Sequence, residues 1–420
     1  MRIGFISTRF HGTDGVSLEA SKWANVLEKD LGHECFWFAG KLDTPEEKSM
    51  LCGKAFFGEE DVISLHKKLF EPNACISDEV RSSVVEMESY LKSSLENFLS
   101  KFSLDLVVPQ NVLAIPMHVP MGLAVTNLID NGIPTIAHHH DFYWERERFL
   151  TGCAKEYLDK AFPPPLRNKF EHVVINSAAN RSLKKRLDIE STIIPNVFDF
   201  ENPPPTSDGY GDDFKEEFGI DQNDIMILQP TRVVPRKGIE LSIELCSKIQ
   251  ARIDKNICLV VSHLYGDEGI EYYNNLVKLA DRASVNVVWA GDRVGETRGF
   301  DKSGRKIYKL WDIYPIADFV TYPSLYEGFG NALLETFYFS KPALVNRYQV
   351  YKDDIEPHGF KVLSIDGRIT EEVVNETIEL FSNDEMANEW TKHNYKLCVE
   401  NFSYNVLRSS LEETLLRIFN

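Results

Sequence analysis

The fold of this chain is decided by residues 322–335, which read Tyr-Pro-Ser-Leu-Tyr-Glu-Gly-Phe-Gly-Asn-Ala-Leu-Leu-Glu. The apolar residues 319–321 before them predict a short strand, and a helix is expected to begin near Asn331. Between the two, glycines allow backbone N–H groups to approach a diphosphate, and the helix N-terminus adds partial positive charge. Two glutamates, Glu327 and Glu335, flank this loop. The pattern predicts a phosphate-binding turn of an α/β sheet, with a plain strand-to-helix loop carrying two solvated carboxylates as the alternative.

A basic loop follows a second strand pattern. Residues 225–229 are mostly apolar, and residues 230–238 read Pro-Thr-Arg-Val-Val-Pro-Arg-Lys-Gly. Ligands of open α/β sheets bind at the carboxyl ends of the strands, so Arg232 and Lys237 can converge there on two phosphates. An ordinary surface loop with three basic residues is the alternative interpretation.

Strand and helix patterns alternate through both halves of the chain, which is typical of parallel sheets covered on both faces. The first half has strand patterns at 3–6, 35–39, 104–108, 134–138, 173–176 and 191–194, and helix patterns at 17–31, 78–102 and 121–131. The second half has strand patterns at 225–229, 257–261, 285–290, 319–321 and 343–345. Two α/β units in series fit 420 residues better than one large sheet.

A composition shift marks the predicted domain boundary. Residues 199–219 contain three consecutive prolines, the pair Asp208-Gly209 and the run Gly211-Asp212-Asp213, a composition typical of a linker. We therefore predict an N-terminal domain over 1–198 and a C-terminal domain over 220–401. Residues 402–420 place Leu407, Leu411, Leu415 and Ile418 at helical spacing, which predicts an amphipathic final helix.

The charge balance disfavours two classes of partner. Forty-six basic against 64 acidic side chains give a formal net charge of −18, which repels nucleic acid and anionic lipid. No apolar run approaches the ~20 residues that span a bilayer, and the first residues form a strand pattern rather than a signal peptide. Seven scattered cysteines are typical of reduced thiols. We therefore predict a cytoplasmic protein without stable membrane insertion.

Three consecutive histidines end another strand pattern, within residues 137–144 (Ala-His-His-His-Asp-Phe-Tyr-Trp). Successive side chains of an extended segment point to opposite sides, so the three cannot bind one metal ion together. A single histidine that hydrogen-bonds a sugar hydroxyl is the favoured hypothesis.

The first strand pattern is followed by residues 10–16, Phe-His-Gly-Thr-Asp-Gly-Val, where a ligand-facing loop is expected. They do not form an intact Gly-x-Gly-x-x-Gly motif, so a nicotinamide dehydrogenase is weakly supported. Residues 50–74 are a candidate acceptor lid, with ordinary packing as the alternative.

Taken together, these motifs resemble the family 4 retaining glycosyltransferases of GT-B fold, with similarity to sucrose-phosphate-synthase-like and mannosyltransferase-like members. The resemblance covers nearly the whole chain and implies two Rossmann-like domains facing a central cleft, with the final helix crossing back to the first domain. It implies transfer of a hexosyl group, with retention, from a nucleotide sugar of UDP-glucose or GDP-mannose type. The acceptor would be a hydroxyl of a small sugar, sugar phosphate or glycerate-type compound.

The resemblance also implies roles for individual residues. His140, Glu327, Arg232 and Lys237 would be catalytic, with His139 as the alternative to His140. The donor would contact Gly15, Arg232, Lys237, Glu327, Gly328, Phe329, Gly330, Asn331, Ala332, Leu333 and Glu335. The acceptor would contact Gly12, Thr13, Asp14, His139, Tyr143 and Arg146, and Arg148 shares with Arg146 the ability to hold a phosphate or carboxylate.

The implied chemistry requires neither a metal ion nor a cofactor beyond the nucleotide sugar, and no Asp-x-Asp metal loop is evident in the sequence. Catalysis would consist of positioning and of electrostatic stabilisation of the departing diphosphate. A catalytically inactive nucleotide-sugar-binding module and a GT-B phosphorylase or epimerase are the alternatives. The sequence leaves the nucleotide, the linkage and the oligomeric state open.

Overall fold

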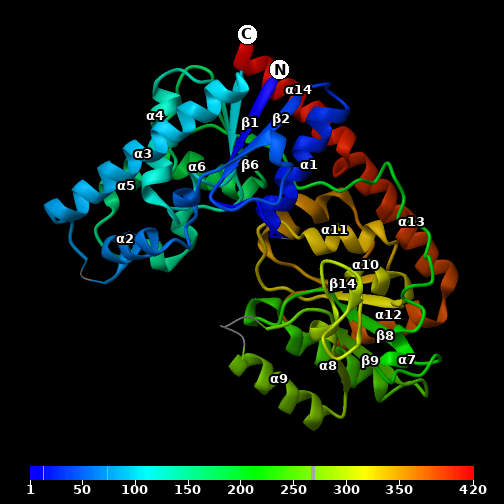
Figure 1. Cartoon of the computed structure of the whole chain (residues 1–420). Helices are drawn as coiled ribbons and strands as arrows, with labels where there is room; N and C mark the ends of the chain where they lie inside the picture. Colours follow the sequence, from blue (N-terminus) through cyan, green and yellow to red (C-terminus); the bar gives the residue numbers. More distant parts are fainter. Residues whose placement is uncertain (13, 73, 266–269) are drawn as a thin grey trace. The chain divides into compact units, whose positions relative to one another are not determined.

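The computed structural model of the chain describes residues 1–12, 14–72, 74–265 and 270–420. It consists of two compact units (Figure 1). The first unit contains Met1–Val197 and Tyr404–Asn420, and the second contains Phe198–Ser403. Each unit is built around its own parallel sheet, which confirms the predicted α/β class with two Rossmann-like sheets.

The first unit has a seven-stranded sheet in the order β3-β2-β1-β4-β5-β6-β7. All of its strand pairs are parallel. The strands are β1 (Arg2–Ile6), β2 (Glu34–Ala39), β3 (Ser49–Leu51), β4 (Leu106–Pro109), β5 (Thr135–His139), β6 (Phe170–Val174) and β7 (Thr192–Ile193). The chain runs outward in opposite directions from β1 and β4, and ligands of such sheets bind at this switch point.

The helices of the first unit are α1 (Gly15–Lys29), α2 (Glu60–Phe70), α3 (Asp78–Phe102), α4 (Val119–Asp130), α5 (Lys155–Ala161), α6 (Ser177–Leu187) and α14 (Tyr404–Phe419). Local capping sets several of their starts. The side chain of Asp14 accepts hydrogen bonds from the backbone N–H groups of Val16 and Ser17 at the start of α1, and Ser77 caps α3 in the same way.

Helix α14 joins the first unit although the whole second unit separates it in sequence from the rest (Figure 1). Its predicted apolar residues, Leu407, Leu411, Leu415 and Ile418, pack into the core that surrounds Trp23 of α1. Arg417 also forms an ion pair with Glu171 of β6, at 2.6 Å. The predicted return of the C-terminal helix to the first unit is therefore confirmed.

The second unit has a six-stranded parallel sheet in the order β10-β9-β8-β13-β14-β15. Its strands are β8 (Ile225–Gln229), β9 (Ile257–Val261), β10 (Asn286–Trp289), β13 (Phe319–Tyr322), β14 (Ala343–Asn346) and β15 (Leu363–Ile365). A separate antiparallel pair consists of β11 (Gly299–Phe300) and β12 (Lys306–Ile307). The helices are α7 (Phe214–Glu217), α8 (Ile239–Gln250), α9 (Ile270–Ala283), α10 (Leu310–Ile313), α11 (Asn331–Tyr338), α12 (Glu371–Ser382) and α13 (Asp384–Asn401).

Several elements that the sequence did not predict are short. Strands β3 and β15 have three residues each, and β11 and β12 have two each, too few to give a periodic pattern. Helix α2 lies inside the interval 50–74 that was predicted only as a candidate lid. Within the described ranges, no helix combines the length and apolar character that crossing a bilayer requires.

The packing of α14 gives a stability prediction with a control on the same helix. Leu411 is 1% exposed in the core, whereas Leu416 is 61% exposed. We expect Leu411→Ala to lower the free energy of unfolding by about 2–5 kcal/mol, because it removes buried methyl groups and leaves a cavity. Leu416→Ala should change it by less than about 0.5 kcal/mol. Urea unfolding of both variants measures the difference, and equal values would contradict the assignment of α14 to this core.

Candidate functional site

The three consecutive histidines of the first unit do not share one environment. The rings of His138 and His140 lie on the same side of β5, 4.4 Å apart, and each has a nitrogen within hydrogen-bonding distance of Gln110 Oε1, at 3.0 Å and 3.2 Å. His138 is buried and stacks on Trp23, whereas His140 is half-buried. The backbone N–H of His140 donates to Asn111 Oδ1 at 3.0 Å. Of the three, His140 is thus the one that retains solvent exposure.

His139 points to the opposite side of the strand, as the alternation of extended residues requires. Its Nε2 lies 2.8 Å from Nδ1 of His172, whose Nε2 lies 3.0 Å from the carbonyl oxygen of Pro164. Both rings are buried. Burial holds the pKa of His139 well below its ordinary value and lowers that of His172 to about 3, so both are neutral at pH 7. The structure therefore places the ring of His139 in the interior of the first unit.

Burial is also the main influence on His140, and it lowers the pKa of this imidazole to about 4 in spite of the nearby Asp141 and Asp14 carboxylates. His140 is consequently a neutral hydrogen-bonding group at pH 7. A neutral imidazole is suited to contact a sugar hydroxyl.

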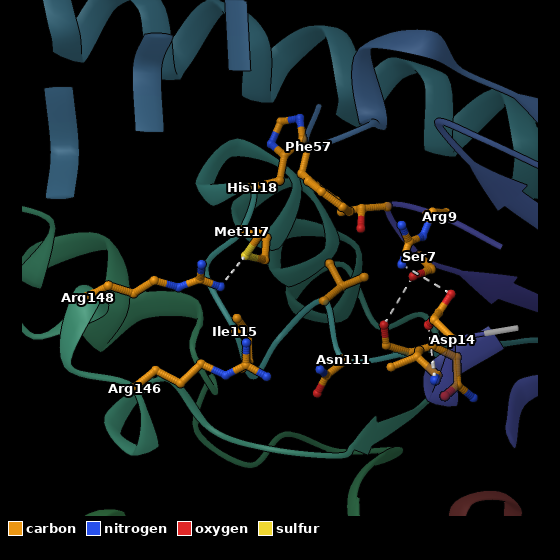
Figure 2. Close-up of a pocket in the computed structure, with 14 residues that line it drawn as sticks. Ser7, Arg9, Asp14, Phe57, Asn111, Ile115, Met117, His118, Arg146 and Arg148 are labelled. Atoms are coloured by element: carbon orange, nitrogen blue, oxygen red, sulfur yellow. Dashed lines mark hydrogen bonds and ion pairs between the residues drawn. The ribbon is translucent and has the colours of Figure 1, made fainter. Parts of the chain in front are cut away.

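A cavity of about 190 Å³ lies at the carboxyl ends of β1 and β4, beside the start of α1 (Figure 2). Its described lining consists of Ser7, Thr8, Arg9, Asp14, Val16, Phe57, Gln110, Asn111, Val112, Ile115, Met117, His118, Arg146 and Arg148. Figure 2 shows the side chains of Arg146 and Arg148 extending from one side and those of Arg9 and Asp14 lying on the other. The cavity thus combines three guanidinium groups with polar side chains in one small volume.

Two of the predicted acceptor residues, Asp14 and Arg146, line this cavity. Asp14 caps α1 and forms an ion pair with Arg9 at 3.3 Å, and Arg146 pairs with Asp141. Gly12 instead donates its N–H to Asp43, at 2.7 Å. Of the other residues predicted for this region, Gly15 is the exposed first residue of α1, and Tyr143 packs edge-on against Trp144. Thr13 lies outside the described residues.

In the second unit, the loops after β8 and β13 lie together because these strands are neighbours in the sheet. Gly238 ends the first loop with a positive φ of 61°, and a Cβ atom there would meet the carbonyl oxygen of Pro323 at 2.5 Å. The N–H of Leu325 donates to the carbonyl oxygen of Arg236 at 2.8 Å. Only glycine permits this approach, so the two loops form one rigid surface.

A buried ion pair joins the two loops. Lys237 Nζ contacts Glu327 Oε1, and Arg236 Nη1 lies 3.0 Å from Glu327 Oε2. The side chains of Lys237 and Glu327 are only 10% and 9% exposed. Burial alone would raise the pKa of the Glu327 carboxyl, but the charges of Lys237 and Arg236 outweigh it and lower that pKa below its ordinary value. The structure therefore brings two of the predicted catalytic residues into direct contact as a charged pair.

Arg232 is exposed at the start of the same loop. His263, which follows β9, completes the group: its Nδ1 lies 2.8 Å from Ser262 Oγ. Burial is the largest cause that lowers the pKa of His263 to about 4, and the positive charges of Arg232 and Lys237 lower it further. The carboxyl edge of this sheet thus carries three cations, of Arg232, Arg236 and Lys237, and a neutral imidazole, a set of groups that can bind phosphate oxygens.

The glycine-rich loop leads directly into α11. Gly330, with φ of 126°, precedes Asn331, and a Cβ atom at Gly330 would collide with the hydroxyl group of Tyr348. That hydroxyl donates to the carbonyl oxygen of Phe329 at 2.8 Å. Phe329 and Leu333 are buried, so their side chains belong to the core and only their backbone groups are suited to a ligand. Gly328 and Ala332 are half-buried.

Glu335 lies one turn into α11, where its Oε1 accepts a hydrogen bond from Trp311 Nε1 at 2.5 Å. Trp311 belongs to α10. Asp312 of the same helix accepts the backbone N–H of Lys309 at 2.8 Å and pairs with Arg298 at 2.5 Å. The orientation of the predicted ribose-binding carboxylate therefore depends on how α10 is held.

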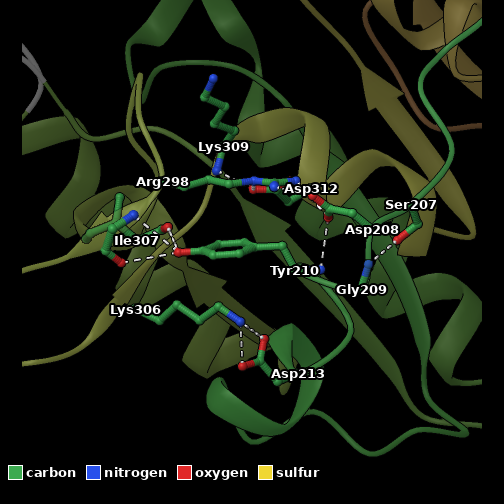
Figure 3. Close-up of polar contacts among 11 residues, drawn as sticks. Ser207, Asp208, Gly209, Tyr210, Asp213, Arg298, Lys306, Ile307, Lys309 and Asp312 are labelled. Carbon is green, nitrogen blue, oxygen red and sulfur yellow. Dashed lines mark hydrogen bonds and ion pairs between the residues drawn. The ribbon is translucent and has the colours of Figure 1, made fainter.

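Residues of the predicted linker, 199–219, help to hold it. The ring of Tyr210 lies between Arg298 and Lys306, at 4.4 Å and 4.2 Å from its centroid, and its hydroxyl group donates to Ile307 O at 3.0 Å (Figure 3). Asp208 pairs with Arg298, and Asp213 pairs with Lys306 at 2.7 Å. The segment also includes α7. These residues are packed within the second unit through cation–π contacts and ion pairs, although their composition is typical of a linker.

Sequence analysis missed several residues of these two regions. Ser262 and His263 follow the predicted strand 257–261. Ligand-binding residues of such sheets are expected at the carboxyl ends of the strands, so this position could have indicated them. Arg236 precedes Lys237 in the same basic loop, and this position was the signal for its contact with Glu327. Gln110 carried no motif, and only the fold brings it to the cavity. Phe57 also lines the cavity and lies in the interval 50–74 that was predicted as a candidate acceptor lid.

Two curated proteins resemble this chain along most of its length. The chain is 33% identical over 447 aligned residues to mannosylglucosylglycerate synthase of Thermotoga maritima, covering 99% of this chain and 100% of the relative. It is also 33% identical over 386 residues to mannosylglucosylglycerate synthase of Petrotoga mobilis, covering 87% of this chain and 86% of the relative. The family model described as glycosyl transferases group 1 matches residues 302–397.

Solved structures share the fold at low sequence identity. A glycosyltransferase from Rickettsia africae superposes with a TM-score of 0.69 at 15% identity, over 100% of this chain and 99% of that one. Sucrose-phosphate synthase from Thermosynechococcus elongatus gives a TM-score of 0.62 at 14% identity, over 100% and 99% of the two chains.

Because the ion pair between Lys237 and Glu327 is buried, removing its carboxylate should destabilise the protein far more than removing an exposed one. Glu327→Gln leaves Lys237 buried without a full counter-charge, so we expect it to lower the free energy of unfolding by about 3 kcal/mol or more. Glu389→Gln, which removes a carboxylate from an exposed pair with Lys361, should leave it unchanged within error. Urea unfolding at pH 7 measures both, and an unaffected Glu327→Gln variant would contradict the burial of this pair.

The buried histidines predict acid sensitivity. His139 and His172 are neutral when folded but gain protons below pH ~6.5 when unfolded. Their contribution to stability is therefore complete above pH ~6.5 and is lost as the pH falls toward the folded pKa of His172, about 3.

Removing one of these imidazoles removes one proton that the chain takes up on unfolding below pH ~6.5. Below pH ~6.5, the His172→Gln variant should lose stability less steeply than the wild type, by about 1.4 kcal/mol per pH unit. Unfolding curves between pH 5 and 7.5 measure the slope, with exposed His11→Gln as the control. Identical slopes in the wild type and His172→Gln would show that His172 is protonated in the folded state.

Proposed function

Because this chain belongs to the family 4 glycosyltransferases, the glycosyl transferases group 1, we propose that it transfers a mannosyl group from GDP-mannose to a glucosylglycerate-type acceptor. The observation that carries the proposal is the full-length relation to mannosylglucosylglycerate synthase of Thermotoga maritima. The product in that enzyme's name carries a mannosyl group on glucosylglycerate, so we take mannose as the transferred sugar. The family supplies the nucleotide-sugar donor, and the proposal adds the sugar, the nucleotide and the acceptor.

The second unit carries the groups that we assign to the donor. Arg232 and Lys237 bind the diphosphate, and backbone groups of residues 328–333 contact the sugar and phosphates. Glu335 accepts hydrogen bonds from the ribose hydroxyls. Glu327 contacts hydroxyls of the mannosyl group with carboxylate oxygens that Lys237 and Arg236 already orient. This assignment is supported by the contact between the two loops and by the rigid glycine turn at Gly330.

Bond formation and cleavage take place on the same face of the sugar. The acceptor hydroxyl attacks C1 of mannose from the side on which the nucleotide departs, a new C1–O bond forms, and the bond from C1 to the β-phosphate oxygen breaks. The hydroxyl proton passes to a β-phosphate oxygen. Because attack and departure take place on the same face of C1, the α-configuration of the donor is retained. Lys237 and Arg232 stabilise the charge that develops on the diphosphate.

In the first unit, we assign His140 to the transferred sugar and the cavity to the acceptor. His140 is half-buried and neutral at pH 7, and it shares Gln110 with the cavity lining. His139, which bonds to buried His172, is left out of this assignment.

The test combines the chain with GDP-mannose and glucosylglycerate and follows the products by proton NMR. We expect GDP release and a new α-linked mannosyl signal in equal amounts. UDP-glucose in place of GDP-mannose should be consumed much more slowly. Failure to consume any nucleotide sugar would overturn the proposal, and a β-linked product would overturn the retaining mechanism.

Two variants connect the activity to the donor loops. Lys237→Met and Glu335→Gln should lower kcat/KM by about 100-fold or more, because each removes a charged contact to the donor. Lys302→Met, an exposed lysine in the turn between β11 and β12 of the same unit, should retain full activity. Wild-type rates in Lys237→Met would show that the donor binds elsewhere.

A further inference from the structure

We propose that the cavity of the first unit is an anion site, in which Arg146 and Arg148 bind the carboxylate of the acceptor and so select acidic over neutral glycosides. This inference rests on the proposed function and deepens it by naming the chemical group that the acceptor must carry. The residues that argue for it come from the loops after β1, β4 and β5.

The lining of the cavity carries more positive than negative side chains. The chain has a formal net charge of −18, yet the described lining of this cavity contains three guanidinium groups, of Arg9, Arg146 and Arg148, and one carboxylate, of Asp14. Arg9 and Asp14 form an ion pair at 3.3 Å, and Asp14 also caps α1. The single lining carboxylate is therefore occupied by structural contacts, and the cavity remains positive.

Arg146 and Arg148 both line the cavity. Both are exposed, and Figure 2 shows them extending side by side from the same segment. Arg146 contacts Asp141, which Asn111 also holds through a hydrogen bond of 2.8 Å. Arg148 Nη2 lies 3.3 Å from the sulfur of Met117. Thioether sulfur is a weak acceptor, so a carboxylate would be a stronger partner for this guanidinium group.

A third observation is an unused hydrogen-bond donor. Gln110 lines the cavity and is 1% exposed. Its Oε1 is shared by His138 and His140, while its Nε2 has no hydrogen-bond partner in the part of the chain that the structure describes. A buried amide donor without a partner is unfavourable, and an oxygen atom of a bound acceptor would relieve it.

The size of the cavity restricts what it can hold. At about 190 Å³, it is smaller than the roughly 300–1,000 Å³ pockets that enclose drug-sized ligands. A three-carbon acid fits this description better than a nucleotide. The bidentate geometry of a guanidinium group matches a carboxylate, so we assign the site to the glycerate end of the acceptor.

The test compares glucosylglycerate with glucosylglycerol, in which a neutral alcohol replaces the carboxylate, and with glucose 6-phosphate. We expect the wild type to prefer glucosylglycerate in kcat/KM by about 10- to 100-fold over both. In Arg148→Gln and Arg146→Gln, KM for glucosylglycerate should rise by a similar factor, while KM for the donor stays constant. The preference over glucosylglycerol should then disappear.

Arg167→Gln is the matched control, because Arg167 is an exposed arginine of the same unit in an ion pair with Asp130. It should retain the wild-type KM for both substrates. Equal use of glucosylglycerate and glucosylglycerol by the wild type would overturn the inference while leaving mannosyl transfer intact. Preference for glucose 6-phosphate would reassign the site to a phosphate.

A binding experiment separates this inference from the proposed function. Saturation-transfer NMR with D-glycerate alone should give signals with the wild type and with Arg167→Gln, but not with Arg148→Gln. If no transfer to glucosylglycerate occurs and D-glycerate still binds through Arg148, the proposed function fails and the anion site stands. If D-glycerate does not bind and transfer is insensitive to Arg146 and Arg148, the anion site is overturned.

Discussion

The carboxyl edge of the second sheet depends on one buried ion pair, between Lys237 and Glu327. Each charge would be unfavourable in the interior by several kcal/mol without the other, so the loops after β8 and β13 can adopt this arrangement only together. The positive φ of Gly238 and the hydrogen bond from Leu325 to Arg236 follow from the same close approach. The ammonium group of Lys237 and the carboxylate of Glu327 are thereby fixed in position before any ligand binds. Such preorganisation is the condition for effective electrostatic catalysis.

The sequence predicted the long elements well, because burial on both faces produces continuous apolar runs. Helix α3 has the predicted bounds, and the strands of four or more residues differ from the prediction by only a few residues. Residues 199–219 were predicted as a linker from their prolines and glycines, and in the structure they belong to the second unit. The ring of Tyr210 between two cations could not be foreseen, since Arg298 and Lys306 are almost a hundred residues away.

The candidate site could be predicted where a motif lies within one loop and not where it is assembled from several. Glu327, Gly330 and Glu335 belong to one strand-loop-helix unit, and the structure brings that unit against Lys237. The alternation rule separated the three histidines, and the resemblance to the family favoured His140 over His139. The structure adds that the ring of His139 is buried against His172. The cavity combines residues of four segments between Ser7 and Arg148, so the sequence pointed to individual members such as Asp14 and Arg146 but not to their meeting in one cavity.

The return of α14 to the first unit also sets an order for folding during synthesis. The second unit is one continuous segment, Phe198–Ser403, and all of it leaves the ribosome before α14 does. The first unit lacks Leu407, Leu411, Leu415 and Ile418 of its core until that moment. The unit that begins first is therefore completed last, and the apolar groove that receives α14 stays open to chaperones throughout translation of the second.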